Sequence, residues 1–546
     1  MLSSPSRRDL LKAGGVLAAT AIGTPLGLRG AMAQTPKRGG TISLRLWDPP
    51  HFDPHLTISY KTNVLYTFTH SRLLKYKAGP GVQPGTFTLE GDLAESWSHP
   101  NETTYIFKLR KGVRWHAKPP VNGRELTADD VKYTFDRFVS EKGNAYRSMM
   151  AALDRVEAVD KYTVKMTLKE PYAWFLDMVA NPMALAIIAR EAVEKFGDLK
   201  KPEAVIGTGP WMLDSYRPNV GLTFVRNPAY FLSGLPYIDK VEVTVDEDTA
   251  SRMAAFIAGK YDLGWEASGT INRVDWVQIK DTLKQRRPKL QSMEFASNQM
   301  SHVYMRTDKP PFSDVRVRRA ISLAFNRQGL LDAVAEGVGV FNPAVPAALK
   351  DWALPVDQLG EGTQYYKFDP ARAKKLLTEA GYANGFPATI SYATYGSTIQ
   401  VDAVQLLLKY MKDIGIDAKP IQQEYGAYIS TTFYGKYESM AFGPQTPFLD
   451  PDNYLFGPYM AGELKNQSHV NDPVLGDMLV RQRRTADVAK RREVLHEIQR
   501  YVAKQQYYVY APSGVYIGVW DAALKNYGPN LGYDWGGRLL AAWLDR

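Results

Sequence analysis

Residues 105–116 read YIFKLRKGVRWH and carry the clearest structural signal in the chain. Tyr105, Phe107 and Leu109 occupy alternate positions, which is the period of a β-strand with one buried face. The same alternation of apolar residues recurs in two other segments, residues 42–46 and 164–168. The sequence therefore predicts at least three strands, each with one side turned toward a core.

Helix signals lie between and after these strands. Thr127 and Asp130 have the spacing of a capping box, and apolar residues follow at helical intervals. Asp314 precedes a second such pattern, and Asp369-Pro370 begins a third that stops at Gly381. Because strands and helices are interspersed along the chain, the fold class is predicted to be α/β.

The order of several motifs resembles one known family, the family 5 extracellular solute-binding proteins of peptide and nickel ABC importers. The motifs that carry the resemblance are DLAESW at 92–97, YIFKLRKGVRWH at 105–116, LTADDV at 126–131, GTGPW at 207–211, NPAY at 227–230, PF at 311–312 with RRA at 318–320, and LLTEAGY at 376–382. One such motif alone would be weak evidence for the family, but the occurrence of all of them in the family's order over hundreds of residues is specific evidence.

This resemblance implies a two-lobed periplasmic binding protein of the large class, with an extra inserted domain. Closure of two lobes by a hinge motion buries the ligand between them. The expected boundaries are a signal peptide at 1–33, a discontinuous first lobe at 34–56, 204–294 and 507–546, an inserted domain at 57–203, and a second lobe at 295–506. Gly207, Gly209 and Pro210 are expected to set a turn.

The first 33 residues have the pattern of an export signal. A basic segment with Arg7 and Arg8 precedes a short apolar stretch, and Ala31-Met32-Ala33 supplies small residues for cleavage. The paired arginines resemble the twin-arginine signal, with Leu10 in place of the usual Phe. We expect cleavage after Ala33; the alternative is an uncleaved anchor helix, which the glycines and proline of the stretch disfavour.

Composition narrows the compartment and the partners. The formal charge is +10, and without residues 1–33 it is about +7, with no long run of Lys or Arg. A nucleic-acid surface would cluster its charge, so no nucleic-acid partner is expected. Cysteine is absent, which excludes disulfides and a lipid-modified cysteine. We expect a periplasmic monomer that is exported, soluble and not lipid-anchored.

One candidate binding segment is 442–452, which reads FGPQTPFLDPD. Peptide-binding members of the family anchor the ligand's amino group with an Asp that follows a Trp, in a W-x-x-D segment ending in Pro. Aligned on Pro451, this chain has Pro444 at the Trp position and Pro447 at the Asp position. The resemblance therefore places a conventionally held free peptide in doubt, unless Asp450 substitutes.

Other candidate contacts follow from position in the fold that the resemblance implies. With Asp450, the ligand-binding candidates are Phe52, Trp265, Tyr425, Gln445 and Phe448. Core packing is an equally good explanation for each aromatic residue among them. His51, Asp53 and His55 suggest a nickel or zinc site, but Pro54 opposes helical pairing and no third ligand is evident nearby. We expect no metal and no cofactor.

The resulting prediction is a solute-binding component of an ABC importer that is not an enzyme. It would capture a peptide-like or other small organic solute, including an oligopeptide, and would deliver it to the membrane permease subunits. Two alternatives remain. One is an exported hydrolase of an oligomeric substrate, for which the chain has no cysteine and no G-x-S-x-G motif. The other is a sensor or interaction subunit without transport.

Overall fold

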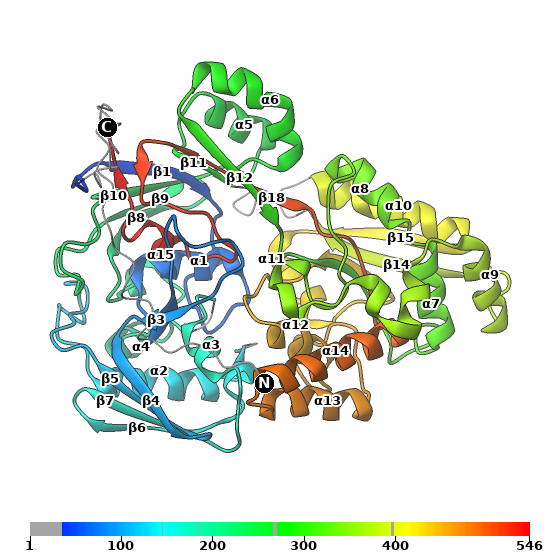
Figure 1. Ribbon diagram of the computed structural model, residues 1–546, viewed down its shortest axis with the longest axis horizontal. Coiled ribbons are helices and arrows are strands. Elements are labelled where there is room, and N and C mark those ends of the chain that lie inside the picture. The colour runs from blue at the N-terminus through cyan, green and yellow to red at the C-terminus, as the bar shows by residue number, and fades with distance from the viewer. Residues whose placement is uncertain (1–34, 145, 184, 266–269, 395–397) are drawn as a thin grey trace, which may run out of the picture. The chain divides into compact units, whose positions relative to one another are not determined.

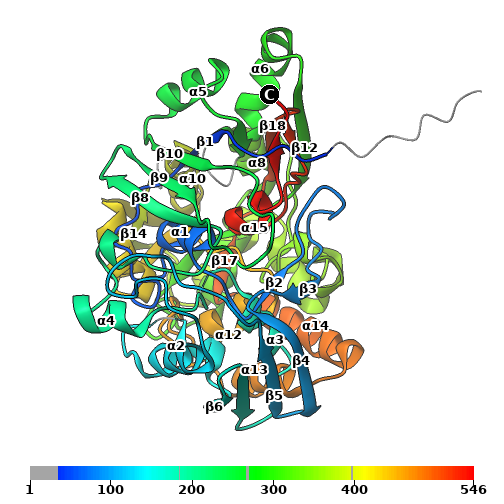
Figure 2. The ribbon, with the colours of Figure 1, turned by 90° about the vertical axis from the view of Figure 1, so that its left-hand side faces the viewer.

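Strand β1 forms one edge of a four-stranded sheet with the order β1-β10-β9-β8 (Figures 1 and 2). The strands are β1 (Thr41–Leu46), β10 (Lys240–Val245), β9 (Gly221–Arg226) and β8 (Trp211–Arg217). β1 pairs with β10 in parallel, and the other pairs are antiparallel. Ile42, Leu44 and Leu46 are buried, which confirms the predicted alternation at 42–46. Helices α1 (Tyr60–Thr69) and α15 (Trp535–Leu539) pack together beside this sheet.

The structure is a computed structural model, and it describes residues 35–144, 146–183, 185–265, 270–394 and 398–546. Within these limits Lys37–Arg546 form one compact unit. The expected signal peptide at 1–33 lies outside the described residues. No helix in the described part of the chain is both long and apolar enough to cross a membrane.

A three-stranded sheet joins segments that are far apart in the sequence. Its order is β11-β18-β12, so the late strand β18 lies between two earlier ones. The strands are β11 (Leu263–Trp265), β18 (Val515–Asp521) and β12 (Leu290–Ala296). The helices next to it in the chain are α5 (Thr249–Ile257) and α6 (Arg273–Arg286).

A five-stranded sheet with the order β15-β14-β16-β13-β17 forms the core of the middle of the chain. Its strands are β13 (Ser301–Met305), β14 (Phe386–Ala393), β15 (Ile416–Gln423), β16 (Met440–Pro444) and β17 (Tyr508–Tyr510). The α-helices of this region are α7 (Val315–Ala324), α8 (Arg327–Ala335), α9 (Pro370–Glu379), α10 (Thr398–Asp413), α11 (Tyr425–Ser430), α12 (Asp452–Tyr459), α13 (Pro473–Arg484) and α14 (Val488–Gln505). As predicted, Asp314 and Asp369 cap α7 and α9.

The chain passes between the three-stranded and the five-stranded sheets twice. We call residues 297–300 the first crossing, which joins β12 to β13, and residues 511–514 the second crossing, which joins β17 to β18. The two crossings are hydrogen-bonded side by side. Ser513 Oγ donates to the carbonyl of Gln299 at 2.8 Å, and the Ala511 amide donates to the carbonyl of Ser301 at 2.8 Å.

A separate four-stranded sheet contains the YIFKLRKGVRWH segment. Its order is β4-β5-β7-β6, with β4 (Ala94–Asn101), β5 (Thr104–Leu109), β7 (Thr163–Leu168) and β6 (Leu153–Asp160). Helix α2 (Ala128–Ser140) packs on it and begins where the capping box predicts. The Thr127 amide donates to Asp130 Oδ2 at 2.9 Å. The other elements here are β2 (Leu74–Tyr76), β3 (Leu89–Gly91), α3 (Phe175–Ala180) and α4 (Arg190–Phe196), and β19 (Leu524–Lys525) pairs with β20 (Trp543–Leu544) elsewhere.

A buried ion pair connects α12 and α13 to the segment before α3. Arg483 Nη2 lies 2.7 Å from Asp452 Oδ2, and the Asp452 side chain has no exposed surface. Tyr172 OH donates to the same carboxylate oxygen at 3.0 Å. The carboxylate is thus fully enclosed and depends on this arginine for its positive partner.

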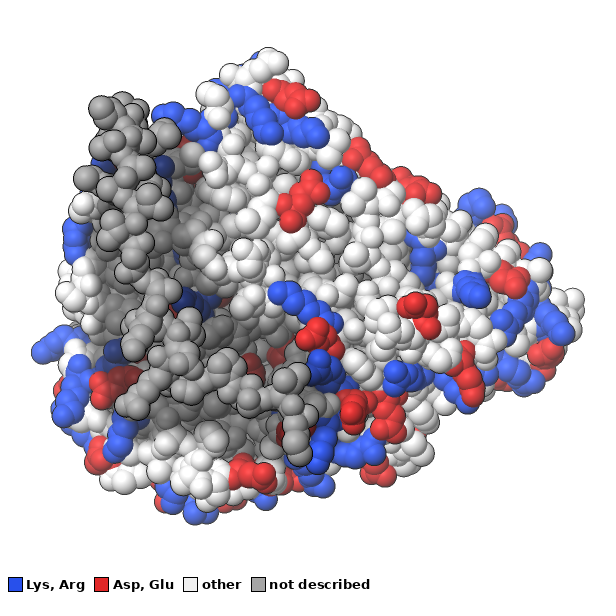
Figure 3. All heavy atoms as spheres, in the orientation of Figure 1, with Lys and Arg blue, Asp and Glu red and all other residues white. Residues whose placement is uncertain are grey.

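Charged groups are mixed on the face shown in Figure 3. Basic and acidic side chains lie next to one another over the ends of α7, α9, α13 and α14, whereas the area around α11 carries mostly uncharged groups.

Candidate functional site

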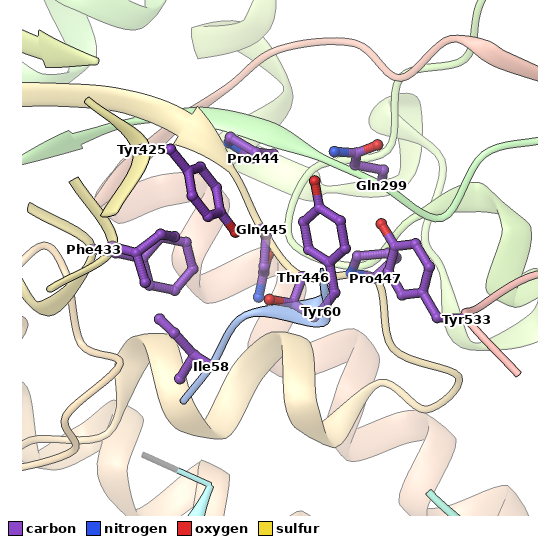
Figure 4. A pocket seen from close by; sticks show the side chains of 11 residues that line it. Ile58, Tyr60, Gln299, Tyr425, Phe433, Pro444, Gln445, Thr446, Pro447 and Tyr533 are labelled. Atoms are coloured by element: carbon purple, nitrogen blue, oxygen red, sulfur yellow. The ribbon is translucent and has the colours of Figure 1, made fainter. Parts of the chain in front are cut away.

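A pocket lies where the start of α1, the first crossing, α11, the end of β16 and the segment before α15 come together (Figure 4). The residues that line it are Ile58, Tyr60, Gln299, Tyr425, Ile429, Phe433, Pro444, Gln445, Thr446, Pro447 and Tyr533. The space among them is about 300 Å³, of which about 10 Å³ can be reached by the centre of a water molecule. That is room for roughly one water, so a larger solute enters only if the walls separate.

One wall, which we call the Tyr60 wall, consists of Ile58, Tyr60 and Tyr533. The rings of Tyr60 and Tyr533 are stacked, with centroids 4.9 Å apart and planes 7° from parallel. Trp47 packs edge-on against both rings, at 4.8 Å and 6.1 Å between centroids. Aromatic packing of this kind fixes the ring planes, so the wall offers a rigid apolar surface to a ligand.

The opposite side, which we call the Tyr425 wall, consists of Tyr425, Ile429 and Phe433. Lys61 Nζ lies 4.2 Å from the centroid of the Tyr425 ring, a cation–π contact. Ser59 Oγ lies 3.1 Å from Tyr425 OH. Both contacts join Tyr425 at the start of α11 to residues on either side of Tyr60, so α11 and the start of α1 are in direct contact.

The residues after β16 form the floor between the walls. Gln445 is 3% exposed, and its amide nitrogen on the main chain donates to the carbonyl of Met300 at 2.7 Å. Its side-chain Nε2 donates to the carbonyl of Tyr454 at 3.4 Å. The other side-chain atom, Oε1, is buried and has no hydrogen-bond partner among the described residues.

The pocket has no charged side chain among the described residues that line it. Burial raises the pKa of Tyr60, Tyr425 and Tyr533, so their hydroxyls stay neutral. Its polar groups are therefore neutral hydroxyls and carboxamides set in an aromatic surface. Such a site can hold a ligand by stacking and by neutral hydrogen bonds.

Two of the six ligand-binding candidates from the sequence, Tyr425 and Gln445, line this pocket. Pro444 and Pro447, which the sequence analysis aligned with the Trp and the Asp of the resembling family, line it as well. Phe448 is buried beside the pocket segment, where its ring contacts Tyr146 and the ammonium of Lys465.

The remaining candidates lie elsewhere. Phe52 is buried, and its ring packs edge-on against Tyr216 at 5.0 Å between centroids. Trp265 ends strand β11, but its side chain lies outside the described residues. Asp450 is 2% exposed and accepts hydrogen bonds from Asn453 N at 2.9 Å and from Asn453 Nδ2 at 2.8 Å. It is not among the residues that line the pocket.

The segment proposed as a possible metal site contains a buried ion pair. Arg137 Nη2 lies 2.6 Å from Asp53 Oδ2, and Arg137 Nη1 lies 2.8 Å from His55 Nδ1. Burial, together with Arg137, lowers the pKa of His55 to about 3. Within the described ranges, no group of three or more His, Asp or Glu side chains could hold a metal ion.

The environment of Asp450 predicts a measurable pH effect. Burial, and next Asp452, raises the pKa of Asp450 to about 7 from 3.8. Between about pH 4 and pH 7 the folded protein therefore keeps a proton that the unfolded chain has lost. The contribution of Asp450 to the free energy of unfolding therefore falls as the pH rises through this window, and levels off above pH 7.

We expect Asp450→Asn to remove this part of the pH dependence, on the order of a few kcal/mol. Urea unfolding at pH 4.5 and pH 7.5 gives the change in the free energy of unfolding between the two pH values. This change should be smaller in the variant than in the wild type. The comparison isolates Asp450, because Asp177, whose pKa burial raises to about 6, is present in both proteins. The same change in the free energy of unfolding in both proteins would show that Asp450 ionises normally.

Tyr60, Tyr533 and Gln299 line the pocket but are not among the residues that the sequence predicts for the site. Tyr60 and Tyr533 belong to opposite ends of the chain and meet only in the folded protein. No local pattern marks them, because each is one of 32 tyrosines. Their stacking becomes visible only from the three-dimensional arrangement.

Comparison with known proteins identifies the family of the chain. The family model for bacterial extracellular solute-binding proteins, family 5 (middle), matches residues 88–464. The di/tripeptide-binding protein 3 of Pseudomonas aeruginosa is 28% identical over 500 residues, covering 84% of this chain and 86% of that protein.

Two solved structures share the fold. The ABC transporter-associated periplasmic binding protein DppA from Helicobacter pylori, in complex with the peptide STSA, has a TM-score of 0.80 and 24% identity, covering 93% of this chain and 99% of that one. The binding protein AgaA of A. tumefaciens R10, in complex with agropinic acid, has a TM-score of 0.79 and 22% identity, covering 93% and 99%. The same architecture thus accompanies chemically different ligands in the two proteins.

Proposed function

Because this chain belongs to the bacterial extracellular solute-binding proteins of family 5, we propose that it captures a small solute in the pocket between the Tyr60 wall and the Tyr425 wall, for an ABC importer. The observation that carries this proposal is the pocket itself, whose two aromatic walls come from segments far apart in the sequence and are brought together by the contact between Ser59 and Tyr425. The protein would carry out no reaction; the importer's ATPase subunits would supply the energy.

We propose that capture works by a hinge between two lobes. The lobes follow those expected from the sequence, at 34–56, 204–294 and 507–546, with the inserted domain at 57–203, and at 295–506. The strands move two of these boundaries to the crossings, because β12 continues to Ala296 in the first lobe and β17 (Tyr508–Tyr510) pairs with β13 in the second lobe. The paired crossings at 297–300 and 511–514 support this assignment, because a change of backbone angles there would move one wall relative to the other. Closure would bury a solute against both walls, and the closed form would dock on the permease.

The solute in this proposal is peptide-like or another small organic molecule. Relatives and neighbours with this fold carry names that include di- and tripeptides, a tetrapeptide and agropinic acid. Pro447 in the pocket favours a solute that does not require an Asp at that position. We further propose that residues 1–33 are a twin-arginine signal peptide and that the protein acts as a monomer in the periplasm, without a lipid anchor.

A thermal-shift screen of peptides, sugars, conjugates and metal chelates tests the proposal. A solute at 100 times its Kd should add about 2.7 kcal/mol to the free energy of unfolding. If no solute in a broad screen shifts the unfolding temperature, the capture function is wrong.

Tyr533→Ala should then weaken binding of the best solute by about 30-fold, or about 2 kcal/mol, because the variant removes one ring of the stacked pair. Isothermal titration calorimetry measures this change. Phe368→Ala is a matched control, since Phe368 is 50% exposed and is not among the pocket residues; it should bind normally. Equal affinity of both variants would place the solute elsewhere.

A further inference from the structure

The buried side-chain oxygen of Gln445 limits what the pocket can bind. Because Nε2 donates to the carbonyl of Tyr454, the orientation of the amide group is set, and Oε1 is the atom that remains without a partner among the described residues. A buried acceptor without a donor destabilises the state that contains it. A ligand that supplies an O–H or N–H donor to Oε1 would remove this deficit.

The neighbouring polar group is also a neutral amide. Gln299 lines the pocket, and its Oε1 accepts a hydrogen bond from Tyr516 OH at 3.1 Å, so Nε2 is the atom of this amide that can donate to a ligand. Gln299 and Gln445 together therefore offer a donor and an acceptor. Hydroxyl groups, which both donate and accept, match this pair.

The charged groups beside Tyr425 have partners already, and Glu424, which precedes it, accepts a hydrogen bond from the Ala427 amide at 3.0 Å. Lys61 Nζ lies 3.6 Å from Glu247 Oε1, and Arg45 Nη2 lies 3.3 Å from Glu247 Oε2. A ligand ammonium or carboxylate enclosed in the pocket would lose its hydration without gaining an opposite charge from the wall. Enclosing an unpaired ion in this way is strongly unfavourable.

We propose that this pocket binds an uncharged polyhydroxylated ring, as in a neutral sugar or the sugar portion of a conjugate. A ring hydroxyl donates to Gln445 Oε1, another accepts from Gln299 Nε2, and an apolar ring face lies on the Tyr60 wall. This inference rests on the proposed function and specifies the chemical class of its solute. It also explains why aromatic rings, rather than charged side chains, surround the space.

The test compares matched sugars on the full chain by titration calorimetry. Glucose and cellobiose are neutral, glucosamine has an ammonium group, and glucuronate has a carboxylate on the same ring. A free dipeptide and its N-acetylated, C-amidated form make a second matched pair. We expect the neutral sugars to bind at least 10-fold more tightly than either charged sugar, and the blocked dipeptide to bind more tightly than the free one.

Variants at Gln445 test the contact itself. Gln445→Met should weaken neutral-sugar binding by about 10- to 100-fold, because the acceptor is lost. Gln445→Glu should shift the preference toward glucosamine, which a purely structural role of Gln445 would not do. Gln422→Met, the same change at an exposed position of β15, should leave binding unchanged. Thermal unfolding confirms that each variant is folded. The comparison of sugars uses the wild-type protein, so it does not depend on the folding of any variant.

The outcomes separate this inference from the proposed function. Tighter binding of glucosamine, glucuronate or the free dipeptide than of their neutral partners would overturn the inference and leave solute capture intact. Binding of other solutes in the broad screen, with no binding of either neutral sugar, would do the same. Failure of the whole screen would overturn both.

Discussion

Arg483→Met should lower the free energy of unfolding by about 3–5 kcal/mol. The arginine is the partner of Asp452, whose side chain has no exposed surface, and Arg483 Nε also lies 2.9 Å from Asp452 Oδ1. Without it, the carboxylate is left buried with only neutral donors such as Tyr172 OH. Urea unfolding followed by tryptophan fluorescence measures the change as a shift of the midpoint.

A variant on the same helix provides the control. Arg481 pairs with Glu497, but their side chains are 52% and 49% exposed, so Arg481→Met should cost less than about 1 kcal/mol. Adding Asp452→Asn to Arg483→Met should restore part of the loss, because it removes the stranded charge. A loss for Arg483→Met as small as that for Arg481→Met would mean that the ion pair contributes nothing.

Gly209→Ala should also be strongly destabilising, by about 3 kcal/mol. A Cβ atom at this position would lie 2.5 Å from the carbonyl carbon of Thr69 and 2.7 Å from the amide nitrogen of His70. Both are main-chain atoms at the end of α1, and the Gly209 amide donates to the Thr69 carbonyl at 2.9 Å. This close approach therefore requires a glycine, whereas the sequence predicts only a turn at this position.

Gly81→Ala is the matched control, because a Cβ atom there would have no neighbour within 4 Å and the backbone has no positive φ. Its unfolding midpoint should stay the same or rise slightly. The two midpoints can be measured under identical conditions. Equal midpoints for Gly209→Ala and Gly81→Ala would contradict this prediction. The end of α1 would then move away from the added methyl group without a loss of stability.

The elements themselves were predictable where their signals are local. Thr127 with Asp130 marks the start of α2 and Asp369 marks the start of α9, because a capping side chain bonds to amides within three residues of it. The pairing of distant strands had no such signal. Nothing in residues 515–521 indicates that they insert between β11 and β12, since strand partners are chosen by packing across the whole sheet.

The candidate site was predictable only in part, for the same reason. Tyr425 and Gln445 were found because the resemblance placed their segments near the ligand, and both line the pocket. Phe52 has the same aromatic character but is buried against Tyr216. Composition cannot separate an aromatic residue of a wall from one of the core, because both positions require an apolar ring.

The position of β18 determines when this protein can fold during synthesis. Strands β11 and β12 both pair with β18, and neither pairs with the other. Until residue 521 has left the ribosome, both strands lack their hydrogen-bonding partner, although most of the polypeptide already exists. This sheet can therefore form only after β18 has been synthesised, and β11 and β12 stay unpaired in the nascent chain until then.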